Sequence, residues 1–156
     1  MKNDLLTDVH LFDNEDGGSI MDSDKDYPCA LKSLFGPRRP AVLFYLGRKA
    51  LLGEPMLLIC GARDASEKAI EIARKCGMSA VSHGFAVASG YARGVDRAAH
   101  LGALEAGGST VAFLPFGLSR FRVNGDIAGE FDPKRFCAVS EVPPAYGFTV
   151  RSAFRR

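Results

Sequence analysis

The sequence predicts an α/β fold, a doubly wound and mainly parallel sheet with helices on both faces. Short apolar runs suited to buried strands begin at Met56, Phe85 and Thr110, and helical patterns separate them. Strands that alternate with helices of this length are joined by right-handed crossovers, which favours one parallel sheet. With 156 residues, of which 47 % are hydrophobic and 24 % charged, the chain has room for one globular core.

The composition sets further expectations. No apolar run approaches the length that crosses a bilayer, and the first residues lack the pattern of a secretory signal, so we expect a cytoplasmic protein without a membrane partner. The four cysteines are scattered, with no C-x-x-C pair and no histidine at ligand spacing. They are therefore predicted to be reduced thiols in the core, with no metal site.

The charge is distributed unevenly along the chain. Residues 1–26 carry eight acids against two lysines, a net charge of −6, which leaves +8 for the rest of a chain whose formal charge is +2. Without apolar periodicity, residues 1–26 are predicted to be a disordered acidic tail before a domain over 27–156. A basic body suits a polyanion such as nucleic acid, although many surfaces carry such an excess without that role.

The first half of the domain predicts mixed elements. Residues 27–35 suggest a short helix that Gly36-Pro37 breaks, residues 41–46 an extended run, and residues 48–52 a helical turn. Residues 56–60 are continuously apolar, as in a strand covered on both faces. Ser66 is placed to cap a helix that ends near Gly84, and its apolar face would comprise Ala69, Ile70, Ala73, Cys76 and Ala80.

The second half of the domain predicts strands and a helix on either side of a glycine turn, the most informative part of the sequence. A strand over 85–88, a glycine turn and a helix over 95–106 come first, and a strand over 110–114 follows. Residues 136–141 suggest a further strand, Pro143-Pro144 a rigid turn, and residues 149–156 the start of a helix.

The glycine turn before the 95–106 helix predicts an anion site. Its glycines allow close backbone approach, and the free N–H groups and dipole of a helix N-terminus attract negative charge. The spacing Gly90-x-x-x-Gly94 matches neither the dinucleotide fingerprint nor the P-loop. It therefore fits a phosphate site and a plain tight turn about equally well.

Three loops leave the carboxyl ends of the predicted strands, where ligands gather in open α/β sheets, so we expect them to share a crevice. Arg63 and Arg93 would face it and grip phosphate with planar guanidinium groups, and Arg122 would extend the basic strip. The alternative is that these arginines are ordinary surface charges. The predicted phosphate-binding residues are Gly61, Arg63, Ser89, Gly90, Tyr91, Arg93, Gly94, Gly117 and Arg120.

Two side-chain pairs in these loops have alternative roles. Tyr91 and Phe116 could stack a base or close the core. Asp96 and His100 lie one turn apart on the same helix face, which suits a catalytic pair, but no serine or cysteine nucleophile stands beside them. Asp96 and His100 are therefore predicted to order the turn as hydrogen-bonded neighbours, and no catalytic residue is assigned.

At these residues the chain resembles the DNA-processing protein A family, also called Smf, whose Rossmann-like domain carries a Ser-Gly-Leu-Ala-Arg-Gly-Ile-Asp-x-x-Ala-His-x-Gly-Ala-Leu signature. Residues 89–104 match it nearly position for position, although Tyr91 replaces a leucine. Gly61-Ala62-Arg63 resembles the family's Gly-Ser-Arg turn and Tyr27-Pro28 its entry segment. Pro115-Phe116-Gly117 stands where a Gly-x-Gly is usual.

The resemblance implies single-stranded DNA binding in a basic crevice and transfer of the strand to the recombinase RecA during DNA uptake. It also implies a homodimer that requires no metal or other cofactor, with Arg63 and Arg93 on phosphates and Ser89, Gly90 and Gly94 supplying amides. The family continues beyond the point that corresponds to Arg156 with another strand and a glycine-rich loop. We therefore expect the domain, and its sheet, to be incomplete at the C-terminal end.

A second class of function stays open, because the same superfamily includes nucleotide sensors and enzymes that cleave nucleoside monophosphates. Those enzymes carry a Pro-Gly-Gly-x-Gly-Thr loop, which this sequence lacks. A sensor therefore fits the sequence better than a hydrolase does.

Overall fold

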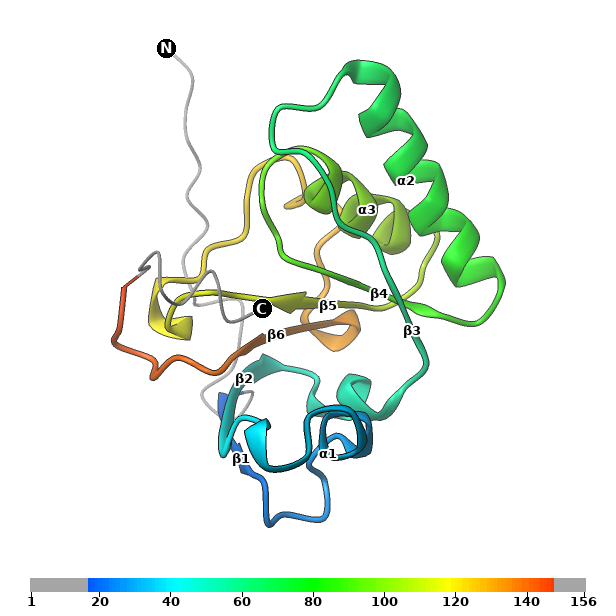
Figure 1. The fold of residues 1–156 in the computed structure, drawn as a ribbon. Helices are drawn as coiled ribbons and strands as arrows, with labels where there is room; N and C mark the ends of the chain where they lie inside the picture. Colours follow the sequence, from blue (N-terminus) through cyan, green and yellow to red (C-terminus); the bar gives the residue numbers. More distant parts are fainter. Residues whose placement is uncertain (1–16, 148–156) are drawn as a thin grey trace.

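The computed structural model describes residues 17–147, which form a six-stranded mixed sheet with three α-helices (Figure 1). The strand order is β1-β2-β6-β5-β4-β3. The strands are β1 (Gly17–Met21), β2 (Val42–Gly47), β3 (Met56–Leu58), β4 (Ala86–Ser89), β5 (Thr110–Phe113) and β6 (Phe136–Ser140). The α-helices are α1 (Cys29–Phe35), α2 (Glu67–Ser82) and α3 (Val95–Glu105), and 3-10 helices are η2 (Gly36–Arg38), η3 (Lys49–Gly53), η4 (Leu118–Arg120) and η5 (Pro133–Arg135).

Strands β3 to β6 pair in parallel, and β2 pairs antiparallel with both β6 and β1. This arrangement confirms the predicted mainly parallel α/β sheet. None of the helices in the described part of the chain is long and apolar enough to cross a membrane.

Strand β1 corrects the predicted boundary of the acidic tail. Residues 17–21 pair with β2, from Gly17 opposite Leu46 to Met21 opposite Val42, and Ile20 is 3 % exposed. The prediction of a disordered tail is therefore wrong for residues 17–26. This segment is ordered because one isoleucine faces inward and because it pairs with a strand that is distant in sequence. The predictions for residues 1–16 and for the helix start at 149–156 lie outside the described residues.

Strand β3 differs from its prediction because, within residues 17–147, it lies at an edge of the sheet. Leu57 is 43 % exposed and Leu58 67 % exposed, so the strand is not covered on both faces. Strands β4, β5 and β6 are buried almost throughout, as predicted.

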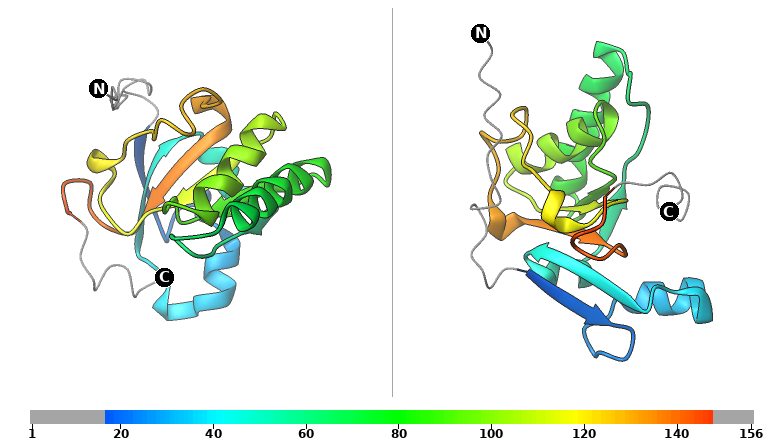
Figure 2. Two further views of the ribbon diagram at one scale, coloured as in Figure 1. Left: turned by 90° about the horizontal axis from the view of Figure 1, so that it is seen from above. Right: turned by 90° about the vertical axis from the view of Figure 1, so that its left-hand side faces the viewer.

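Helices α2 and α3 lie together on one face of the sheet, whereas α1 lies on the other (Figures 1 and 2). The contact between α2 and α3 is closer than ordinary side chains would permit. A Cβ on Gly77 would collide with the Ala99 carbonyl oxygen, and one on Gly102 with the Arg74 carbonyl oxygen. The buried face of α2 is therefore Ala73, Gly77 and Ala80, and the predicted members Ile70 and Cys76 are exposed.

The ends of α2 follow the predicted local chemistry. The Ser66 hydroxyl accepts a hydrogen bond from the Ala69 amide at 3.3 Å, which caps the helix N-terminus. The chain leaves the helix through Gly84, whose φ of 80° suits glycine.

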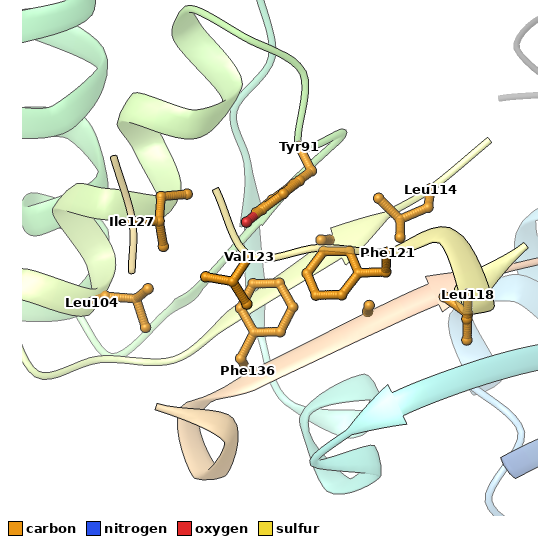
Figure 3. Packing of buried hydrophobic residues seen from close by; sticks show 10 residues of the cluster. Tyr91, Leu104, Leu114, Leu118, Phe121, Val123, Ile127 and Phe136 are labelled. Carbon is orange, nitrogen blue, oxygen red and sulfur yellow. The ribbon is translucent and has the colours of Figure 1, made fainter. Parts of the chain in front are cut away.

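The core divides between the two faces of the sheet. On the α3 face, Leu104 packs with Tyr91, Phe121 and Phe136 (Figure 3). On the α1 face, Leu51 and Leu52 of η3 pack with Val111, Cys137 and Val139.

The cysteines are free thiols, but their predicted placement in the core is correct only for Cys137. Cys29, Cys60 and Cys76 are exposed. The prediction followed the general tendency of free cysteine to be buried, whereas the exposure of a given cysteine depends on which face of its element it occupies.

Candidate functional site

The loops that follow β3 and β4 are packed directly against each other. The Val95 amide donates a hydrogen bond to the Ala62 carbonyl oxygen at 3.2 Å. Gly94 has a φ of 88°, and a Cβ there would collide with the Ala62 and Arg63 carbonyl oxygens. Two of the three predicted loops therefore meet at the carboxyl edge of the sheet, and Gly94 is the residue that lets them approach.

The Asp96 carboxylate holds this junction together from inside. Asp96 is 6 % exposed, and its two oxygens accept hydrogen bonds from the amides of Gly61 at 3.2 Å and Ala92 at 3.4 Å. A buried carboxylate needs such donors to offset the loss of water. Since Val95 also donates to Ala62, three amides at the start of α3 and in the loop beside it already have an acceptor within the protein.

Arg63 and Arg93 extend outward from these joined loops. Arg63 is exposed, and it forms no ion pair with any residue between 17 and 147. The Arg93 guanidinium lies 3.2 Å from the Asp64 carboxylate, and the two side chains are 68 % and 99 % exposed. Such an exposed pair contributes roughly 0–1 kcal/mol and exchanges readily with other ions. Asp64 was not among the predicted site residues, although it lies between Arg63 and the start of α2 in the sequence.

Ser89 and Gly90 lie where β4 ends, close to the same junction. Ser89 is 1 % exposed, and its hydroxyl donates to the Ile59 carbonyl oxygen at 2.6 Å. Its side chain therefore joins the ends of β3 and β4 and does not point into solvent.

The third loop is held by a different part of the chain. The Gly117 amide donates to the Tyr146 carbonyl oxygen at 2.8 Å, and a Cβ on Gly117 would collide with the carbonyl oxygens of Pro143 and Pro144. Arg120 ends η4 and is exposed. The hydrogen bonds of this loop thus lead to residues 143–146 rather than to the two joined loops.

Tyr91 lies inside the core, which argues against the predicted stacking of a base on its ring. The residue is 8 % exposed, its hydroxyl accepts from the Asn124 amide at 3.1 Å, and its ring packs against Phe121 (Figure 3). Burial raises the pKa of the phenol. Its φ of 61° is rare for a residue other than glycine. Phe116 is half-buried and packs against the same cluster.

His100 is completely buried and does not bond to Asp96, which corrects the predicted pairing. Its Nδ1 lies 2.6 Å from the Thr110 hydroxyl, whose own proton is donated to the Val87 carbonyl oxygen at 2.8 Å. The histidine must therefore donate from Nδ1, which leaves Nε2 unprotonated and without a partner among the described residues. Burial lowers the pKa of this imidazole to about 3, so it is neutral and anchors α3 to β4 and β5.

A hollow of about 570 Å³ opens on the α1 face of the sheet, near the carboxyl ends of the strands. Its walls are mostly apolar, with Arg38, Asp96 and Glu141 among the few charged groups. None of the predicted arginines lines it, so the expected basic crevice is instead an exposed basic edge beside an apolar hollow. The sequence did not predict that apolar residues around this hollow would be exposed. Their exposure depends on the order of the strands, which leaves the α1 face of the sheet partly uncovered.

Comparison with known proteins identifies the family. The sequence model of the DNA recombination-mediator protein A family matches residues 18–156. DNA processing protein DprA of Streptococcus pneumoniae is 33 % identical over 119 residues, which cover 74 % of this chain and 40 % of that protein. Protein Smf of Synechocystis is 37 % identical over 99 residues, which cover 61 % of this chain and 24 % of that protein. The chain thus spans less than half of the length of these relatives.

Solved structures agree with this assignment. The X-ray structure of the Streptococcus pneumoniae DprA matches with a TM-score of 0.74 and 27 % identity, over 87 % of this chain and 47 % of that one. A structure of DprA from Helicobacter pylori, described for its single-stranded DNA binding mode, matches in fold with a TM-score of 0.69 and 18 % identity, over 89 % and 61 % of the two chains. With its Rossmann-like sheet and its signature around Asp96, the chain belongs to the DNA recombination-mediator protein A family, the DprA/Smf family.

Proposed function

We propose that this chain binds single-stranded DNA through the basic edge formed by Arg63 and Arg93. The observation that carries the proposal is the direct packing of their two loops, with both guanidinium groups exposed. DprA from Helicobacter pylori, whose structure was described for its single-stranded DNA binding mode, supports the choice of ligand.

The chemistry of this edge favours backbone phosphates over bases. Guanidinium groups bind phosphate oxygens through two parallel hydrogen bonds, and such contacts do not depend on sequence. The aromatic ring nearest in sequence, Tyr91, is buried and gives no stacking platform. We therefore expect binding with little base preference and a strong dependence on salt.

The remaining predicted residues have supporting roles in the proposal. Gly61, Ser89 and Gly94 shape the loop junction through their close contacts, and Asp96 occupies the inner amides. Arg120 and the loop around Gly117 would extend the basic edge for a longer strand, and Gly90 would allow the strand to approach the backbone.

The wider role is proposed from family membership. The chain would protect or present single-stranded DNA in the cytoplasm and transfer it to the recombinase RecA, acting as a homodimer. Because the chain covers only part of its relatives, each of these activities is to be tested with the chain itself.

The test measures binding of a fluorescently labelled oligothymidylate by anisotropy at several salt concentrations. The double variant Arg63→Ala/Arg93→Ala should weaken binding on the order of ten- to a hundredfold and lower the slope of log K against log salt by about 1.4, since each lost phosphate contact removes about 0.7. The matched control, Lys75→Ala/Lys134→Ala, removes two exposed charges in α2 and η5, outside the loops that carry Arg63 and Arg93, and should change affinity little. Equal binding by both double variants would refute the site.

A nucleotide-binding role for the same edge is distinguished in the same assay. Nucleoside monophosphates at millimolar concentration should compete weakly with the oligonucleotide if the edge binds several phosphates of a phosphodiester backbone. Strong competition would favour a nucleotide sensor, and release of free base would favour the enzyme.

A further inference from the structure

We propose that Asp64 competes with the DNA backbone for Arg93: its carboxylate occupies the guanidinium group, and a phosphate must displace it in order to bind there. The inference rests on the proposed DNA binding and names a residue of the chain that limits it. Asp64 would thus set how tightly the basic edge holds a strand, although it makes no favourable contact with the strand itself.

The ion pair between Asp64 and Arg93 joins the two loops of the basic edge. Asp64 belongs to the loop after β3 and Arg93 to the loop after β4, and the Asp64 carboxylate lies 3.2 Å from an Arg93 guanidinium nitrogen. The backbones of these loops touch, because a Cβ on Gly94 would collide with the carbonyl oxygens of Ala62 and Arg63. The carboxylate is therefore held within reach of Arg93, at a high effective concentration that a free anion does not have.

The local structure does not require a carboxylate at Asp64. Its side chain is 99 % exposed, and Arg93 is the one hydrogen-bonding or ionic partner of that side chain among residues 17–147. Carboxylates also stabilise helix N-termini, but α2 already has Ser66 as its cap and Glu67 in its first turn. Asp64 precedes the cap by two residues and lies outside that turn. The ion pair with Arg93 is the contact that remains.

The ion pair makes the two arginines of the edge unequal. Arg63 has no ionic partner in the described part of the chain and can bind a phosphate directly, whereas Arg93 must first release the carboxylate. Because both members of the pair are exposed, the exchange is open to solvent and should weaken phosphate binding only by roughly two- to fivefold. The same exchange favours release of a strand, since the carboxylate can replace a departing phosphate.

The test compares neutral and charged replacements of Asp64 in the binding of labelled oligothymidylate, measured by anisotropy at low salt, where exposed ion pairs are least screened. Asp64→Asn should bind roughly two- to fivefold more tightly than wild type, because Arg93 is then free. Asp64→Glu retains the carboxylate and should keep the wild-type affinity. Tighter binding by Asp64→Glu as well would attribute the gain to the shape of the loop, and would overturn the proposal.

Glu67→Gln is the matched control for net charge. Glu67 is exposed, lies three residues further along the chain, and pairs with no arginine among residues 17–147. Its replacement changes the charge near the edge without releasing Arg93, so any gain in affinity should stay below that of Asp64→Asn. Equal gains would indicate a general effect of charge and would refute a specific role for Asp64.

A double-mutant cycle isolates the pair itself. In the Arg93→Ala background, Asp64→Asn should give no more than the small gain of Glu67→Gln, because no guanidinium group is left to release. An undiminished gain in that background would exclude competition for Arg93.

The outcomes also separate this inference from the proposed function. If no variant binds oligothymidylate, the basic edge is not a DNA site and both proposals are refuted. If the wild-type chain binds and Asp64→Asn binds no more tightly, DNA binding stands and the competing role of Asp64 alone is refuted.

Discussion

The Asp96 carboxylate accepts a hydrogen bond from the Gly61 amide at 3.2 Å, although the two residues are 35 positions apart in sequence. This contact joins the first turn of α3 to the loop after β3, and so places the two proposed DNA-binding loops next to each other. The negative charge that the helix N-terminus attracts is thus supplied by the protein itself.

Replacement of Asp96 should therefore destabilise the fold as well as the site. Asp96→Ala leaves the Gly61 and Ala92 amides without their acceptor in these partly buried contacts and should lower the free energy of unfolding by about 1–3 kcal/mol. Urea denaturation measures the change. Asp126→Ala, which removes an exposed partner of Arg97, serves as the control and should cost at most about 1 kcal/mol. Equal losses in the two variants would show that the Asp96 contacts contribute little.

Gly94→Ala should be among the most damaging single-methyl additions in the chain. Its φ of 88° disfavours any side chain, and the new Cβ would collide with backbone oxygens that cannot rotate away. We expect a loss of about 2–4 kcal/mol in unfolding free energy, with weaker oligonucleotide binding. At Gly125 the added Cβ meets nothing within 4 Å and φ is not positive, so Gly125→Ala should be nearly neutral. A neutral Gly94→Ala would mean that the loops are not closely packed in solution.

The buried His100 predicts a loss of stability in acid. The folded imidazole has its pKa lowered from 6.5 to about 3, so it stays neutral while the unfolded form takes up a proton below about pH 6.5. Unfolding is then favoured as the pH falls from about 6.5 toward 3, by up to about 1.4 kcal/mol per pH unit.

Thermal and urea unfolding between pH 7 and pH 4 would measure this slope. His100→Asn keeps a donor near the Thr110 hydroxyl but does not titrate, so its stability should depend less steeply on pH. His83 is exposed, and His83→Asn should retain the wild-type slope. If His100→Asn and wild type have the same slope, His100 is not the group responsible.

The thiols should fall into two reactivity classes. Cys29, Cys60 and Cys76 are exposed, whereas Cys137 is buried and its pKa is raised to about 12 by loss of water. At pH 8, a thiol reagent should label three cysteines quickly and the fourth only on unfolding. In Cys137→Ala, denaturant should add no further label. Rapid labelling of Cys137 in the native protein would contradict its burial.

Local patterns in the sequence predicted most of the α/β frame. Ser66 and Gly84 marked the ends of α2, and the apolar runs at β4, β5 and β6 identified the buried strands, because capping and burial leave signals within a few residues. Strand β1 was missed because its order depends on pairing with β2. The exposure of β3 was missed because a continuous apolar run does not reveal a position at the sheet edge.

The site was predicted less completely than the fold. The sequence identified the loops that carry Arg63 and Arg93, and the packing of Gly94 against Ala62 brings these loops together. The direction of a side chain depends on the rest of the core, however, and no local pattern showed that Tyr91 turns inward or that His100 bonds to Thr110. Whether these arginines bind DNA stays a prediction.

The glycine contacts between α2 and α3 have a mechanical consequence. Because Gly77 and Gly102 let the two backbones touch, the helices cannot slide past each other without a steric collision, and the Arg74–Glu105 ion pair bridges them as well. Arg63 precedes one helix and Arg93 precedes the other. The packing of α2 against α3 therefore fixes the distance between the two arginine-bearing loops. A polyanion that binds both loops would find this distance already established before binding.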